Sequence, residues 1–140
     1  MGKINWGKVV LGGLVAGIII DVVEGIVEGV ILGPEWREAM KALGRPLRET
    51  GTNVTLHILL GFAYGITALW LYAAIRPRFG AGPRTALYAG ICAWVLGNLL
   101  PSVNWGPQGV LPSYLFAIAA LVGLVEMVVA TEAGAWLYQE

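Results

Sequence analysis

The sequence predicts an all-α integral membrane protein, a four-helix bundle with a short interfacial helix between the first and second spans. Hydrophobic residues make up 57% of the 140 residues and charged residues only 13%, whereas soluble domains are about a quarter charged. Mean hydropathy is +0.72. Between Arg84 and Glu126 there is no charged residue, and a stretch of that length can hold two membrane crossings. We therefore expect one transmembrane domain over residues 1–140, with the lipid bilayer as its surroundings.

Four segments are long and apolar enough to span the hydrocarbon core, which takes roughly 20 residues of helix. The first begins after Lys3 and has no small-residue cleavage site before Asp21, so we interpret it as an anchored helix rather than a signal peptide. Connectors of roughly 21, 8 and 11 residues separate the four segments. The predicted spans cover about residues 6–32, 54–75, 84–100 and 112–136.

The first connector has the pattern of a short helix lying on the membrane surface. Pro34 suits the first turn of a helix and Gly44 suits its end. Between them, three apolar residues repeat at i, i+4 and i+7, which is typical of an interfacial anchor: Trp36, Met40 and Leu43. The last connector, residues 101–109, is neutral and rich in turn-forming residues, so we expect a loop that caps the bundle.

The distribution of basic residues predicts the orientation of the spans. Five Lys and Arg lie on the side that holds both termini, and four lie in the long connector. Because cytoplasmic loops carry the excess of Lys and Arg, this margin favours both termini in the cytoplasm. We expect the protein in a bacterial or archaeal inner membrane.

Charge and cysteine content exclude several classes of function. Nine Lys and Arg balance nine Asp and Glu, so the chain lacks the positive field that nucleic-acid binding needs, and we expect no such partner. Cys92 is the only cysteine, which excludes intrachain disulfides, thiolate metal clusters and a dithiol relay. His57 is the only histidine, which excludes a haem held by two histidines.

The first predicted helix places acids and small residues on one face. Small residues let another helix approach closely, and acids inside a membrane need a partner or water. We therefore expect this face to point into the bundle. At about 100° per residue it covers an arc of roughly 80° and consists of Gly13, Gly17, Asp21, Glu24 and Glu28.

The second and fourth predicted helices carry similar faces. Gly61 and Gly65 share a face with His57, and Gly123 lies beside Glu126 on the fourth helix. The third helix packs through small residues, and Asn98 is turned roughly a quarter-turn away from them. Asn98 is therefore a weaker candidate for the interior.

The antiparallel path arranges the ionisable groups as a track through the membrane. At about 1.5 Å per residue, Glu28 and His57 share a level near the long connector and can meet. Asp21 and Glu126 lie near mid-membrane, and Glu24 lies between the two levels. No Lys or Arg is available at mid-depth, so the acids must be protonated, hydrated or bound to a cation.

The track predicts proton- or cation-coupled transport or conduction, because chains of carboxylates and histidines recur in pumps and transporters. The central exchange site consists of Asp21 and Glu126. The relay at its entrance consists of Glu24, Glu28 and His57.

Three other hypotheses stay open at this stage. The chain is an accessory or assembly subunit whose small-residue faces, including Gly25 and Gly29, pack against partner helices and whose acids pair with a partner's basic residues. It is a membrane enzyme that acts on a lipid or quinone through Tyr64 and His57, although no phosphate loop, nucleophile elbow or cysteine pair supports this; we expect no enzyme. It holds a metal ion, Mn, Fe or Mg, on a carboxylate-rich site whose candidates are Glu24, Glu28, His57 and Glu126.

Four features have a counterpart in known proteins: Asn5-Trp6 opening the first crossing, the surface helix from Trp36 to Gly44, Trp94 inside the third span, and a fourth span after a Pro-containing loop. Together they resemble uncharacterised bacterial four-helix inner-membrane proteins. The resemblance is one of architecture over nearly the whole chain, and it implies a topology but no activity or cofactor. Because five buried acids leave a single bundle little apolar packing, we expect a homo-oligomer or a membrane-complex partner.

Overall fold

The structure, a computed structural model, describes residues 3–138, and this part of the chain contains helices and no strand. Four helical stretches are long and apolar enough to cross a membrane: Trp6–Ile31, Gly51–Phe79, Pro83–Gln108 and Ser113–Leu137. The predicted all-α four-helix bundle is confirmed. The elements are α1 (Trp6–Glu24), η1 (Gly25–Ile31), α2 (Gly33–Ala42), α3 (Gly51–Phe79), α4 (Pro83–Trp94), η2 (Val95–Leu99), α5 (Leu100–Trp105), η3 (Gly106–Gln108) and α6 (Ser113–Leu137).

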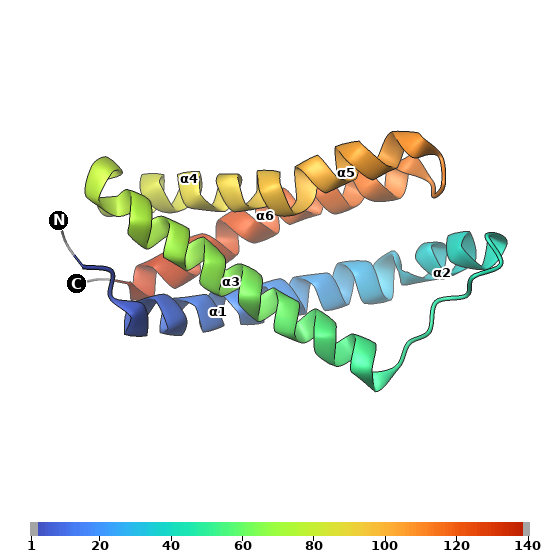
Figure 1. Cartoon of the computed structure of the whole chain (residues 1–140), viewed down its shortest axis with the longest axis horizontal. Helices are drawn as coiled ribbons and strands as arrows, with labels where there is room; N and C mark the ends of the chain where they lie inside the picture. The colour runs from blue at the N-terminus through green and yellow to red at the C-terminus, as the bar shows by residue number, and fades with distance from the viewer. Residues whose placement is uncertain (1–2, 139–140) are drawn as a thin grey trace.

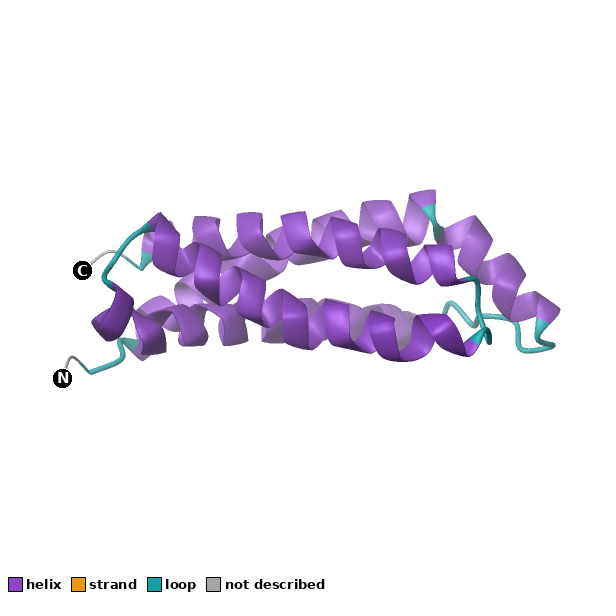
Figure 2. Cartoon of the chain, turned by 90° about the horizontal axis from the view of Figure 1, so that it is seen from above, coloured by secondary structure: helices purple, strands orange, loops and turns teal. Residues whose placement is uncertain are grey.

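The four long stretches alternate in direction, and both ends of the chain lie at the same end of the bundle (Figure 1). α1 packs against α3 and α6, and α4 packs against the same two helices, so α1 and α4 are diagonal to each other. Loops occupy only the two ends of the bundle, and the rest is helix (Figure 2). Every connection therefore joins neighbouring antiparallel helices, which is the up-and-down arrangement of a four-helix bundle.

Glycines bring α1 and α3 into close contact. A Cβ built on Gly13 would lie 2.5 Å from the Cα atom of Ile66, and one built on Gly17 would lie 2.8 Å from the Cα atom of Phe62. A Cβ built on Gly65 would overlap the backbone oxygen of Gly13. Since real Cβ atoms do not approach backbone atoms this closely, the helix spacing here requires residues without side chains.

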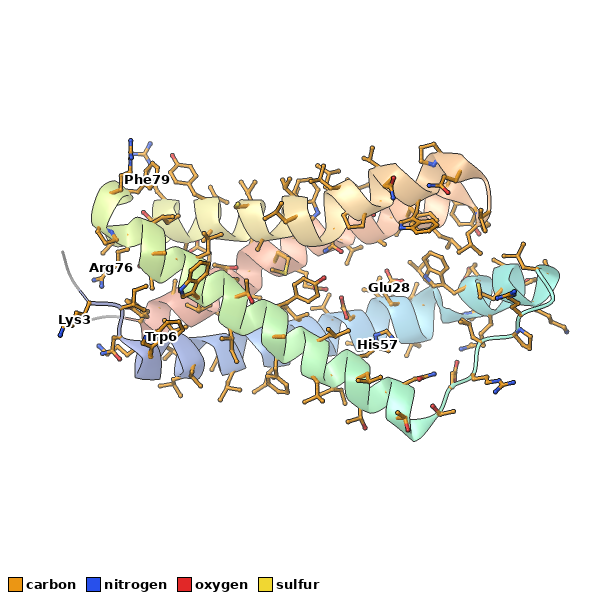
Figure 3. All side chains as sticks on the ribbon, in the orientation of Figure 1. Lys3, Trp6, Glu28, His57, Arg76 and Phe79 are labelled. Atoms are coloured by element: carbon orange, nitrogen blue, oxygen red, sulfur yellow. The ribbon has the colours of Figure 1, made fainter. Side chains whose placement is uncertain are left out.

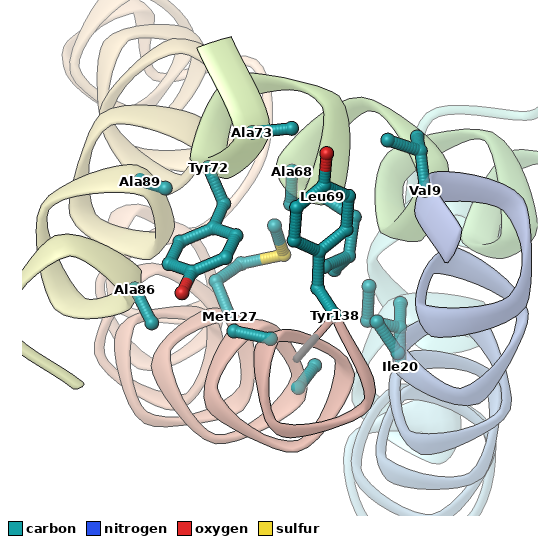
Figure 4. Close-up of a cluster of buried hydrophobic side chains, with 13 residues drawn as sticks. Val9, Ile20, Ala68, Leu69, Tyr72, Ala73, Ala86, Ala89, Met127 and Tyr138 are labelled. Atoms are coloured by element: carbon teal, nitrogen blue, oxygen red, sulfur yellow. The ribbon is translucent and has the colours of Figure 1, made fainter. Parts of the chain in front are cut away.

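The apolar core lies in the half of the bundle nearest the termini (Figure 4). Ile20 and Leu69 are fully buried there, and the rings of Tyr72 and Tyr138 meet edge to face at 5.8 Å. The Tyr138 hydroxyl also accepts a hydrogen bond of 3.0 Å from the backbone N–H of Asn5. This half of the bundle is consequently closed by both apolar and polar contacts.

The half of the bundle nearest the long connector is open. Every residue from 51 to 60, the first third of α3, is exposed, and this part of α3 diverges from α4 and α5 (Figure 1). Residues 25–31 of η1 have no buried member. The helices are therefore closely packed in the half nearest the termini and spread apart in the half nearest the long connector.

The predicted short helix after the first span is present as α2. Pro34 lies in its first turn and Glu35 is the acid there, while Gly44, just beyond its end, has a positive φ of 70°. Both features match the general preference for proline at a helix start and glycine after a helix end.

The third span differs from its prediction, because the loop expected over residues 101–109 is helical as far as Gln108. Pro101 lies in the first turn of α5, directly after the wide turn of η2. In that turn Leu100 donates its backbone N–H to the carbonyl of Val95, a bond to the fifth preceding residue. The wide turn accommodates a proline that would break an ordinary α-helix. Gly109, with a φ of 70°, ends the helix instead.

Replacing Gly65 by alanine should lower the free energy of unfolding by about 1–3 kcal/mol, because the added Cβ would overlap backbone atoms of α1 that cannot move aside. Gly25→Ala is the matched control, since nothing lies within 4 Å of a Cβ at that position. Reversible unfolding in mixed micelles, followed by circular dichroism, measures both variants. Equal effects of the two substitutions would contradict the assigned contact.

Candidate functional site

Three of the predicted acids line one small cavity within the spanning region. Glu24 of α1, Glu28 of η1 and Glu126 of α6 lie on its wall, and its volume is about 90 Å³. A water molecule takes up roughly 30 Å³ in the liquid, so the cavity of about 90 Å³ has space for about three waters. The remaining lining residues are Val27, Asn98, Ala119, Val122 and Gly123.

Glu126 is the most deeply buried acid of this cavity, with 5% of its surface exposed. Glu24 and Glu28 line the same cavity, so the ionisable groups around Glu126 are carboxylates. Among the described residues it forms no hydrogen bond and no ion pair, and the ion pair between Arg37 and Glu49 lies far away in the connector region. The site therefore concentrates negative charge without a basic side chain to balance it.

Asp21 lies in the contact between α1 and α3, outside the wall of the cavity. Its carboxylate occupies the space left by the missing side chain of Gly61, where a built Cβ would overlap it. The Oδ2 atom of Asp21 is buried and has no hydrogen-bond partner. Asp21 and Glu126, expected to form one exchange site, therefore face different neighbouring helices while remaining within electrostatic reach.

His57 shares a level with Glu28 along the bundle, as the rise of the two helices predicts (Figure 3). The two side chains form no hydrogen bond in the described part of the chain, because this part of α3 diverges and His57 is exposed. The histidine therefore lies beside the acids at the open end of the bundle rather than against Glu28.

Glu28 has a different partner, the indole of Trp36 on α2. The Nε1–H group of Trp36 donates a hydrogen bond of 2.7 Å to Oε2 of Glu28. The same indole meets the ring of Phe116 on α6 edge to face, with 5.5 Å between ring centroids. The sequence predicts Trp36 as a membrane-surface anchor, but the hydrogen bond follows from the tertiary position of α2. The indole thus links η1 and α6 at the connector end of the cavity.

Asn98 is the site residue that helical periodicity does not find. Its side-chain amide lies against Gly123, where a built Cβ would overlap the Nδ2 atom, and it lines the acid cavity. Asn98 belongs to η2, and a π turn holds more residues than an α turn. The extra residue rotates Asn98 from the flank of the helix towards α6. The sequence signal is Pro101, which comes three residues later and disfavours an ordinary α-helical turn before it.

The cavity holds acids but no compact cluster of metal ligands. Among residues 3–138, no group of three or more His, Cys, Asp or Glu side chains is arranged to hold a metal ion. Tyr64, the proton donor in the enzyme hypothesis, is 41% exposed and lies over Gly97 of η2.

No protein-family model matches the chain, and no curated protein or solved structure matches it either. We therefore infer function from the chemistry of the acid cavity and its surroundings.

Replacing Trp36 by phenylalanine should lower the free energy of unfolding by about 1–2 kcal/mol, because the ring remains while the hydrogen bond to Glu28 is lost. Trp105→Phe is the control: Trp105 is 53% exposed, and we expect a change below about 0.5 kcal/mol. Unfolding in mixed micelles measures both variants. In a Glu28→Gln background, Trp36→Phe should lower the free energy of unfolding by less than it does in the wild type. An equal effect in both backgrounds would contradict a stabilising hydrogen bond between Trp36 and Glu28.

Proposed function

We propose that this small polytopic membrane protein moves protons or small cations through its acid cavity, with Glu126 as the central exchange group. The observation that carries the proposal is the convergence of Glu24, Glu28 and Glu126 on one cavity of about 90 Å³ whose lining contains no Lys or Arg. A structural role for these acids would be served by pairing them with Lys or Arg, which the described residues do not do.

The energetic cost of placing acids in a membrane supports a role in exchanging protons or cations over a position where the acids are merely tolerated. Placing one charged side chain at the centre of a membrane helix costs about 2.5–3.5 kcal/mol on insertion scales. Three carboxylates around a shared cavity repel one another as well, so binding of a proton or cation is strongly favoured. Because that binding is reversible, the same groups can pass the ion along the cavity.

The remaining predicted residues fit the connector side of such a path. His57 is exposed at the level of Glu28, and histidine changes its charge near neutral pH. Together with Glu28 and Glu24 it forms the proposed relay, while Trp36 restricts access by holding Glu28. Asp21, whose buried Oδ2 atom has no hydrogen-bond partner at the α1–α3 contact, is a second group that can hold a proton.

The packing of the bundle supports access from one side in this conformation. The cavity lies towards the spread connector half, whereas Ile20 and Leu69 are fully buried in the core of the terminal half. The charge bias supports both termini in the cytoplasm of a bacterial or archaeal cell, with the acid cavity open towards the opposite side of the inner membrane.

Glu126→Gln should abolish ion movement, because an amide cannot bind or release the proton or balance a cation. Proteoliposomes that contain a pH-sensitive dye measure proton flux under an imposed potential, and parallel vesicles with sodium or potassium gradients measure cation flux. Glu35→Gln is the control, since Glu35 is exposed on α2 and should leave the flux unchanged. Flux through the intact protein equal to that of empty vesicles, for all three ions, would dispose of the proposal.

A second candidate function is that of an assembly subunit, and one observation favours it. Nothing lies within 4 Å of a Cβ built on Gly25 or Gly29 of η1, so this GxxxG pair is open to a helix from a second copy or another membrane protein. A partner helix with a Lys or Arg would also neutralise the acids.

Replacing both Gly25 and Gly29 by leucine should release such a partner, because the larger side chains prevent close helix approach. Purification in a mild detergent, with light scattering to determine the mass of the complex, measures the loss. A wild-type protein that purifies as a monomer, alone, would contradict the assembly function and leave the flux proposal untouched.

A further inference from the structure

A second space beside the acids is an apolar groove between α1 and α6. Its volume is about 430 Å³, and every lining residue except Glu126 is aliphatic. Small-molecule sites have volumes of roughly 300–1,000 Å³, mostly apolar walls and a few well-placed polar groups, and the groove matches that description. The aliphatic residues are Ile19 and Val23 of α1 with Leu121, Val122, Val125 and Val129 of α6.

The groove opens at mid-span, where the surroundings are the hydrocarbon of the membrane. Val125 lies at the middle of α6, whose ends are Ser113 and Leu137, so at about 1.5 Å per residue it is roughly 18 Å from either end. Leu121, Val125 and Val129 are all at least half exposed there. The helices α1 and α6 diverge from the terminal end towards the long connector (Figure 1). A molecule must therefore dissolve in the bilayer before it can reach the groove.

Glu126 and Val122 form the boundary between the groove and the acid cavity, because both residues line both spaces. Glu126 is 5% exposed, and among residues 3–138 its carboxylate has neither a hydrogen bond nor an ion pair. Neither lining contains a Lys or Arg. A positive charge beside Glu126 must therefore be supplied by a bound ion or molecule.

We propose that Glu126 binds hydrophobic organic monocations, which enter from the bilayer with an apolar body in the groove and a positively charged nitrogen beside the carboxylate. The inference rests on the proposed function, since it names a class of cation that the exchange group accepts. Charge decides between occupants, because an acyl chain or an apolar helix would fill the groove but leave Glu126 without a counter-ion. Opposite charges also attract more strongly in these apolar surroundings than in water.

Binding of tritiated benzyltributylammonium to the full chain in lipid nanodiscs tests the role of charge. The competitor is its neutral analogue, in which carbon replaces the charged nitrogen, and we expect it to bind more weakly than the cation. Glu126→Gln should weaken binding of the cation by about tenfold or more, because truncating one member of a buried charge pair is costly. Glu132→Gln is the matched control: it changes another acid of α6, outside both linings, and should leave the affinity for the cation unchanged.

Val125→Trp tests the groove, because the larger side chain takes the space of the apolar body. Leu96→Trp is its control, since Leu96 of η2 is 65% exposed, Val125 is 64% exposed, and Leu96 lies outside the groove. We expect Val125→Trp to weaken binding of the cation about tenfold, as overfilling a packed site does, and Leu96→Trp to leave it unchanged. Equal effects of the two tryptophans would overturn the groove as the site.

Equal affinities for the cation and its neutral analogue would assign the groove to uncharged chains and overturn the proposal, as would unchanged binding in Glu126→Gln. The comparison of the two compounds uses the wild-type protein, so it decides the matter even where a variant fails to fold by circular dichroism. Absence of binding to a wild-type protein that still moves protons or cations overturns this inference alone. Binding without any ion flux contradicts the proposed function and supports the site.

Discussion

The close contact between α1 and α3 at Gly13, Gly17 and Gly65 is the constraint on which the rest of the architecture depends. It brings two backbones together near the terminal half of the bundle, and long helices that meet closely at one end separate towards the other. The core fills the closed half, and the acids occupy the spreading half.

The two π segments carry two of the polar groups that line that cavity. Glu28 lies in η1 and Asn98 in η2, and in each segment the wider turn changes the direction of the side chains that follow. In η2 the cause is local, because Pro101 cannot donate the backbone hydrogen bond that an α-helix needs. For η1, Gly25 and Gly29 supply no side chains to pack against a neighbour, so the helix has few contacts that would hold ordinary α-helical geometry.

The helices could be predicted from the sequence because hydropathy and the length of a membrane span depend on composition alone. The position of Glu24 and Glu126 on the cavity wall follows from helical periodicity, since small residues and acids share one face of each helix. The bond between Trp36 and Glu28 depends on where the chain returns after α2, which periodicity does not encode. The separation of Asp21 from Glu126 depends on Gly61, a residue on another helix, and the inward turn of Asn98 on a departure from 3.6 residues per turn.

The two ends of the bundle handle charge in opposite ways, and this difference bears on function. At the terminal end, Arg76 and Glu132 line one cavity, so that a basic and an acidic side chain lie near each other. In the acid cavity, Glu126 has carboxylates as its charged neighbours and is nearly inaccessible. A protein that served only as a membrane anchor would not need this carboxylate, because alanine at position 126 would avoid the cost of desolvating it. Retaining an unbalanced carboxylate at that depth is physically reasonable where its protonation or its binding of a cation is itself the useful event.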